Sequence, residues 1–253
     1  MPDVRIDLSI PDLLPDTLPV LALRRGTLLP GGVMPLTVGR PRSLAAVEAV
    51  RDGLLLVVPQ REAVERPAPS DLVSTGVLAR IVGKQTTKGR LQLLVQGVSR
   101  VSLTGFPSTH PYLEARFAVE RETWPESPRA EAMRQEFEQV AGEAAELFGN
   151  KGPLEALLES GVDTGLLVDA IAHVMQEPDA WKKGLLQTKD PLARAEQVLE
   201  RLVRVREVLT ARKAIQDRVR GEANQQHKEY MLRQQLKAIQ EELGEGGDGD
   251  ELA

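Results

Sequence analysis

The chain has 253 residues, a formal net charge of −5 and no cysteine. Without cysteine it can form no disulfide, cysteine nucleophile or thiolate metal site, and this composition fits a reducing compartment. Hydrophobic residues make up 42% of the sequence and aromatic residues only 3%, so the core must consist of Leu, Val and Ala. The N-terminus lacks a signal-peptide pattern, and no apolar run approaches the roughly 18 residues that span a membrane. We therefore expect a soluble cytoplasmic protein with no membrane contact.

Charge is distributed unevenly along the chain. The formal charge is +3 over residues 1–120, −7 over 121–190, +3 over 191–243 and −4 over 244–253. No segment has the one-signed excess expected of an obligate nucleic-acid binder. The same four ranges are our predicted organisation: a β-rich subdomain, a helical subdomain, one long helix and a flexible tail.

The first 120 residues predict about six strands with one or two helices. A short helix is expected from Pro41, with Leu44, Val47 and Val50 on one face, and Gly89 favours a hairpin turn. Many short strands with a helix predict a small, partly closed barrel. Apolar runs bounded by turn residues predict the strands at 18–23, 33–38, 54–58, 72–82, 91–95, 98–103 and 112–119.

Helical patterns follow Trp124. Ser127 and Pro128 suit a helix start, and Asp163 is expected to cap a second helix. We also expect a loop at 149–153, a short helix at 154–158 and a bundle that includes the start of the long helix. The predicted inward faces comprise Met133, Phe137, Val140, Ala144, Leu147 and Phe148 in the first helix, and Leu167, Ile171 and Val174 in the capped one.

Residues 192–243 predict one long helix, begun by Asp190 as N-cap and Pro191 at the first helical position. Unbroken, it would be about 80 Å long at 1.5 Å per residue, which is more than a domain of this size can bury. We expect the first apolar stripe to pack on its own domain. The alternative is a bend or break near Gly221, with both halves on one core. The first stripe is Leu192, Ala195, Leu199, Leu202, Val205, Leu209, Ile215 and Val219.

A second apolar stripe on this helix is rotated about 220° from Val219 at 100° per residue. Its leucine and isoleucine spacing is that of a short coiled-coil seam, and the neighbouring Met231 offers an adaptable apolar contact. We predict contact with another subunit or a following module, with ordinary helix packing as the alternative. The candidate contact residues are Tyr230, Met231, Leu232, Leu236, Ile239 and Leu243.

Basic residues also gather on the long helix, with only Glu207 and Asp217 among them. They could form a weak contact surface for acidic partners or DNA phosphates. A solvated helix face is the favoured interpretation, because no aromatic residues interleave for base stacking. The candidate basic surface is Arg201, Arg204, Arg212 and Arg218, flanked by Arg206, Lys213 and Arg220.

No catalytic, cofactor-binding or metal-binding residue is assigned. No phosphate-binding loop is present, and the glycine-rich string at 244–249 follows a helix instead of a strand. His110, His173 and His227 are scattered without ligand-like partners. No serine lies in a Gly-x-Ser-x-Gly or Ser-x-x-Lys arrangement.

At 224–245 the sequence reads NQQHKEYMLRQQLKAIQEELGE, and shorter runs include LPVLALR at 18–24, PLTVGR at 35–40 and QGVSRV at 96–101. In this order the runs resemble the N-terminal region of the bacterial Lon family of ATP-dependent proteases. The likeness is strongest at 224–245, which resembles the segment leading into that family's ATPase module. The resemblance implies a PUA-like β-rich domain. It also implies that the ATPase module, with its ATP and Mg²⁺, and the Ser–Lys protease domain would lie beyond Leu243.

We therefore expect a non-catalytic region that binds unfolded or damaged proteins and adaptors and aids subunit assembly, with the long helix supporting a homo-oligomer. The alternative is a PUA-like RNA-binding module, permitted by the mild positive charge of the first 120 residues. A further alternative is a stand-alone coiled-coil scaffold, although the second stripe is short for a coiled coil. Another is a hydrolase of unrecognised type, which would need a pocket with converging polar groups.

Overall fold

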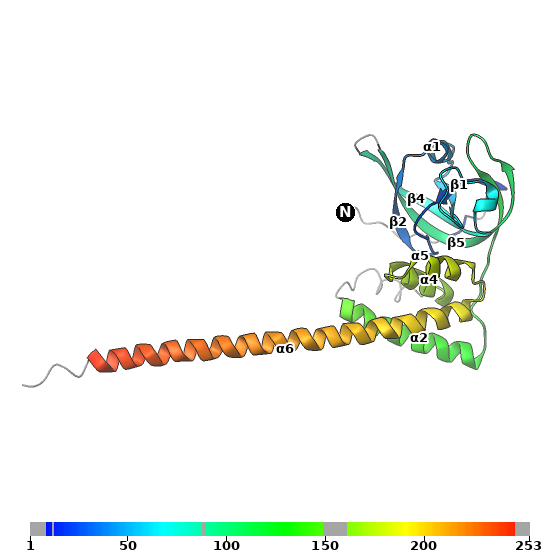
Figure 1. Ribbon diagram of the computed structural model, residues 1–253. Coiled ribbons are helices and arrows are strands. Elements are labelled where there is room, and N and C mark those ends of the chain that lie inside the picture. The colour runs from blue at the N-terminus through cyan, green and yellow to red at the C-terminus, as the bar shows by residue number, and fades with distance from the viewer. Residues whose placement is uncertain (1–8, 12, 88–89, 149–160, 246–253) are drawn as a thin grey trace, which may run out of the picture. The chain divides into compact units, whose positions relative to one another are not determined.

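The computed structural model describes residues 9–11, 13–87, 90–148 and 161–245 (Figure 1), without the side chains of 145–148, 222–223, 226–227 and 240–245. The fold class is α+β, as predicted, with a strand-rich part followed by helices. The chain divides into two compact units, Met1–Leu202 and Val203–Ala253. The predicted subdomain boundaries, after residue 120 and after residue 190, stay predictions. None of the described helices is long and apolar enough to cross a membrane.

Six strands form one sheet in the order β2-β5-β4-β3-β1-β6. Strand β6 also pairs with β5, so the pairing through β1, β3, β4, β5 and β6 returns to its start, and β2 lies beside β5. Apolar side chains from these strands and from Leu72, Val73 and Leu113 beside them form a hydrophobic core. The strands are β1 (Thr17–Leu23), β2 (Val33–Val38), β3 (Leu54–Pro59), β4 (Thr75–Thr87), β5 (Arg90–Ser108) and β6 (Glu114–Val119).

The continuous apolar run of β3 predicted a buried strand, and all six of its residues are buried. It pairs in parallel with β1 and antiparallel with β4. A strand covered on both faces needs apolar residues on both, which explains why this run does not alternate.

The prediction of separate strands at 91–95 and 98–103 was wrong, because both belong to β5, a strand of 19 residues. Gly97 lies where the apolar pattern is interrupted. Its N–H donates to the Gly32 carbonyl over 2.8 Å, and its carbonyl accepts from the Gly31 N–H over 2.9 Å. A side chain at Gly97 would overlap the Leu29 backbone, so the break in pattern marks a close backbone approach instead of a turn.

The short helix forms as α1 (Pro41–Glu48), and of its predicted face Val47 is buried, whereas Leu44 and Val50 are not. Ser43, Ala46 and Val47 are buried, while Leu44 is half-buried. Val50 lies beyond the end of the helix. A shift of one residue along a helix rotates a side chain by about 100°, which is enough to move it to the edge of the buried face.

Three further helices are α2 (Pro128–Phe148), α4 (Thr164–Val174) and α5 (Asp179–Gln187). Both predicted caps form: the Ser127 hydroxyl accepts from the Ala130 N–H over 3.2 Å, and the Asp163 carboxylate from the Gly165 N–H over 2.9 Å. Val174 was wrongly placed inward, since its side chain is 69% exposed and Met175 is buried instead. The chain turns extended at Met175, so the helical period no longer applies there.

Phe137, Val140 and Ala144 of α2 are buried as predicted, and Met133 is half-buried. The predicted positions of Leu147 and Phe148 lie outside the described side chains, and the predicted segments 149–153 and 154–158 lie outside the described residues.

The long helix is α6 (Pro191–Glu245), with the Asp190 carboxylate accepting from the Leu192 N–H over 3.0 Å as predicted. The helix continues through Gly221, so the alternative of a break there was wrong. Ala195, Leu199 and Leu202 are buried.

Farther along α6 the predicted first stripe no longer packs. Ile215 and Val219 are 65% and 59% exposed, which corrects the expectation that they pack on their own domain. Periodicity tells which residues share a helix face, but not how far a neighbouring element covers it.

Candidate functional site

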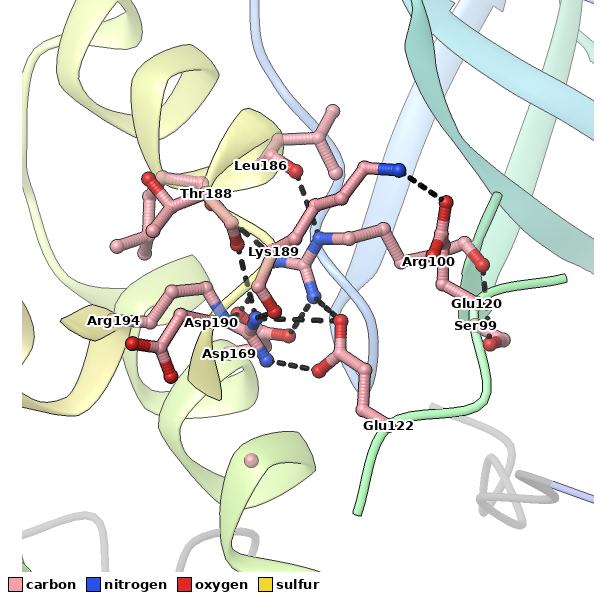
Figure 2. A network of polar contacts seen from close by, with 12 residues as sticks. Ser99, Arg100, Glu120, Glu122, Asp169, Leu186, Thr188, Lys189, Asp190 and Arg194 are labelled. Atoms are coloured by element: carbon pink, nitrogen blue, oxygen red, sulfur yellow. Dashed lines mark hydrogen bonds and ion pairs between the residues drawn. The ribbon is translucent and has the colours of Figure 1, made fainter. Parts of the chain in front are cut away.

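The most concentrated polar chemistry in the described residues is a buried network around Arg100 of β5 (Figure 2). The Arg100 guanidinium donates to both oxygens of Asp169 on α4, over 2.9 and 3.1 Å, and to the Glu122 carboxylate over 2.8 Å. Its Nε donates to the Leu186 carbonyl at the end of α5 over 2.8 Å. One side chain thus connects the sheet to two helices and to the segment that follows β6.

A second buried arginine, Arg194 in the first turn of α6, completes the network. It donates to the carbonyls of Thr188 and Lys189 over 3.0 and 2.9 Å, and to both oxygens of Glu122. Its Nε lies 3.2 Å from Asp169 Oδ1. Two arginines therefore face two carboxylates, and the formal charges balance.

Burial alone would lower the pKa of Arg100, but the paired carboxylates of Asp169 and Glu122 outweigh burial and raise it. The Arg100 guanidinium stays charged and bonded, and a buried charge is tolerated only under such conditions. The network therefore holds the helices on the sheet. Both of its carboxylates are paired with arginines.

A signal for this network is present in the sequence, although none of the predicted site residues belongs to it. Arg100 lies between the apolar Val98 and Val101 in a strand, and Asp169 lies in an otherwise apolar helix. Charged residues of opposite sign in mostly apolar surroundings predict that the two charges meet, because neither could be buried alone.

The described histidines do not form a metal site. His173 packs on Gly32, with its Nε2 3.2 Å from the Val33 carbonyl oxygen, and burial lowers its pKa. His110 is exposed, and the side chain of His227 is not among those described. No group of three or more described His, Asp or Glu side chains could hold a metal ion.

The residues of the predicted basic surface of α6 differ in their exposure and in their contacts. Arg201 donates to Glu177 over 2.5 Å and lies 4.9 Å from the centre of the Trp181 ring, so it is engaged within the first compact unit. Arg204, Arg212 and Arg218 are exposed, as are Lys213 and Arg220, while Arg206 is half-buried.

The candidate apolar contact residues of α6 are exposed in this chain. The exposed fractions are 59% for Tyr230, 48% for Met231, 58% for Leu232, 59% for Leu236 and 51% for Ile239. The side chain of Leu243 lies outside those described. Five large apolar side chains within ten residues are more than a free helix of a monomer usually exposes.

These observations define a class of protein. It is an α+β domain whose helices are connected to its sheet by buried ion pairs, and its last helix continues into a segment with exposed apolar side chains. A family model described as the ATP-dependent protease La (LON) substrate-binding domain matches residues 17–204. The chain belongs to this family, which confirms the resemblance seen in the sequence.

Curated relatives agree with this assignment. The chain is 41% identical to Lon protease 2 of Myxococcus xanthus over 238 residues, which are 92% of the chain and 29% of the relative. It is 39% identical to Lon protease of Anaeromyxobacter dehalogenans over 237 residues, covering 91% of the chain and 28% of the relative. The chain thus spans less than a third of these relatives' length.

A solved structure, the N-terminal domain of Mycobacterium avium complex Lon protease, shares the fold with a TM-score of 0.57 at 21% identity. The aligned region covers 74% of this chain and 98% of the solved domain.

Proposed function

We propose that this chain is the part of a Lon-type ATP-dependent protease that captures unfolded or damaged polypeptides and presents them to the rest of the enzyme. The observation that carries the proposal is the match of residues 17–204 to a substrate-binding domain family. Adaptor proteins are a second class of partner for the same region. ATP, Mg²⁺ and the Ser–Lys dyad would act in parts of the relatives that this chain does not cover, and the working compartment would be the cytoplasm.

The strand-rich part is proposed to be a PUA-like β-barrel. The pairing of β6 with both β1 and β5 supports this, because a sheet that pairs back on itself has the connectivity of a barrel. PUA-like folds also serve as RNA-binding modules, and RNA is therefore the competing ligand in the test below.

Capture is tested by fluorescence anisotropy of a labelled, permanently unfolded protein titrated with this chain. Saturable binding that a structured RNA leaves unchanged, and that weakens for the folded form of the same protein, is the expected result. Binding to RNA alone, lost on adding salt, would assign the chain to the nucleic-acid class.

The exposed apolar residues of α6 are proposed to contact another subunit. Leu236 and Ile239 are more than half exposed, and their spacing fits a short helix–helix seam. Alanine at both positions should lower the mass measured by light scattering at a fixed concentration, while circular dichroism retains the strand signal. The matched control is Lys237→Ala, which lies in the same turns but about 100° around the helix from Leu236. An unchanged mass for the Leu236→Ala/Ile239→Ala variant would refute the seam.

A weak contact between the exposed arginines of α6 and DNA is a further proposal. Arg204, Arg212 and Arg218 support it by their exposure. Titration of labelled duplex DNA at two salt concentrations measures this contact directly, because phosphate contacts weaken steeply with salt.

A further inference from the structure

A groove of about 580 Å³ lies between the end of β1 and the strand β2. Its apolar lining comes from both strands and includes Leu23, Leu36 and Val38. Four of its lining residues are arginines: Arg24, Arg25, Arg40 and Arg90.

One wall of the groove is the outer edge of β2. Among the described strands, β2 pairs only with β5. The Gly97 N–H donates to the Gly32 carbonyl, one pair before Val33 and Gln96, so by alternation the residues that bond β5 are Met34, Leu36 and Val38. Pro35, which has no N–H to donate, then falls in a pair that is not hydrogen-bonded. Val33, Pro35 and Thr37 then direct their backbone groups away from β5.

The surroundings of β2 agree with this assignment. The Val33 carbonyl, at one end of the edge, lies 3.2 Å from His173 Nε2, on the side away from β5. Thr37 is the outward position within the groove that has both a backbone N–H and a carbonyl. An edge of this kind is a template on which an extended chain can pair.

The other wall is β1, and Arg40 lies at its edge. Ala22 pairs with Val58 of β3 on one side, and its carbonyl accepts a 2.5 Å hydrogen bond from the Arg40 guanidinium. This bond fixes the guanidinium beside the groove. Arg40 is half-buried, whereas Arg24, Arg25 and Arg90 are exposed at the rim.

The charges in the groove are of one sign. None of the described residues that line it is acidic. Burial and the neighbouring charge of Arg24 lower the pKa of Arg40, and the charge of Glu65 offsets only part of this. Like charges held together in a partly apolar site are stabilised when an anion binds between them.

Two features favour a polypeptide over a nucleic acid as the source of that anion. The lining contains no aromatic residue on which a base could stack. An apolar groove beside an unpaired strand edge is the surface that binds extended peptides by strand addition.

We propose that this groove binds an extended, acidic segment of a captured polypeptide, which pairs with the edge of β2 at Thr37 and places carboxylates against the four arginines. The inference rests on the proposed capture of polypeptides and names one substrate class for it. Within a captured chain, segments with alternating apolar and acidic residues would bind best, because alternate side chains of a strand face the groove.

The probe is a fluorescein-labelled ten-residue peptide that alternates Val and Glu, compared with the same peptide carrying Gln for Glu. The Glu peptide should bind saturably, weaken with added salt and outcompete the Gln peptide. Arg24→Glu should weaken it roughly fivefold, as expected for one exposed charge contact. Arg116→Glu is the matched control, because Arg116 on β6 is also an exposed arginine but does not line the groove.

Thr37→Pro tests the strand edge separately from the charges. It removes an N–H that points away from β5, so the sheet should persist by circular dichroism while the peptide binds roughly fivefold more weakly, the loss of about one hydrogen bond. Normal binding by both Arg24→Glu and Thr37→Pro would overturn the proposal, as would tighter, Arg24-dependent binding of a ten-nucleotide single strand.

The two proposals fail in distinguishable ways. If the unfolded protein binds, and both Arg24→Glu and Thr37→Pro bind the Glu peptide as tightly as the unchanged chain does, capture stands and the groove proposal is overturned. If no polypeptide binds at all, both are overturned.

Discussion

Replacing Arg100 with Met would remove the central charge of the buried network while keeping much of the side-chain volume. The change leaves the Leu186 carbonyl without its donor and removes two charge-assisted hydrogen bonds from Asp169, which is only 1% exposed. Arg194 remains 3.2 Å from Asp169, so the carboxylate keeps one ion pair.

Breaking a buried ion pair from one side typically costs about 3–5 kcal/mol. We expect the lower half of that range, about 3–4 kcal/mol, because Arg194 still compensates part of the charge. For a unit of this size such a loss lowers the thermal midpoint by roughly 6–16 °C, at about 2–4 °C for each kcal/mol.

The assay is urea unfolding followed by circular dichroism at 222 nm for Arg100→Met, Asp169→Leu and the double variant. The losses of unfolding free energy of the two single variants should together exceed the loss of the double variant by about 1–3 kcal/mol. The reason is that the second change removes a partner that the first has already left unpaired. Arg134→Met is the matched control: Arg134 pairs with Glu131 on the exposed face of α2, and its loss should leave the midpoint unchanged.

A loss below about 1 kcal/mol for Arg100→Met, or strictly additive losses, would refute the reasoning. Either result would mean that the helices stay on the sheet through apolar packing, with the ion pairs adding little.

Further predictions concern α4, where it packs on the loop before β2. Gly32→Ala should lower stability by about 1–3 kcal/mol in urea unfolding, because a Cβ would overlap the His173 ring, whereas Gly105→Ala, with open space around it, should not. Burial lowers the pKa of His173 from its ordinary value of 6.5, so the unfolded chain binds the proton more tightly than the folded one. Its contribution to stability is complete above pH 6.5 and is lost as the pH falls toward the folded pKa. His173→Gln should therefore flatten the fall in thermal midpoint between pH 7 and pH 5; an unchanged slope would contradict this.

Local chemistry was readable from the sequence wherever the deciding residues are neighbours in the chain. The strand at 33–38 and the caps at Asp163 and Asp190 depend on a few adjacent residues, and all three form as predicted. The family was readable for the same reason, because its motifs are short runs in a fixed order.

Features set by distant contacts were not readable. The union of two runs into β5 depends on the approach of Gly31 and Gly32 to Gly97, more than 60 residues away in the chain. Val174 was misplaced because helical periodicity does not reveal how far neighbouring elements cover the end of the helix. Ile215 is exposed because no element among the described residues covers it. The helical period of the sequence around Ile215 contains no information about such a covering element.

The pairing order of the sheet has a consequence for synthesis. Val33 of β2 pairs with Gln96, and Thr17 of β1 pairs with Arg116, so the first two strands emerge from the ribosome long before the segments that complete their pairing. At roughly 5–20 residues per second, the interval for β2 is about 3–13 s. During that time the apolar runs of β1 and β2 have unpaired edges and are open to wrong pairing. A domain proposed to capture unfolded chains is thus itself incompletely paired for seconds during its own synthesis. The translation rate sets how long its unpaired strands need protection from wrong pairing.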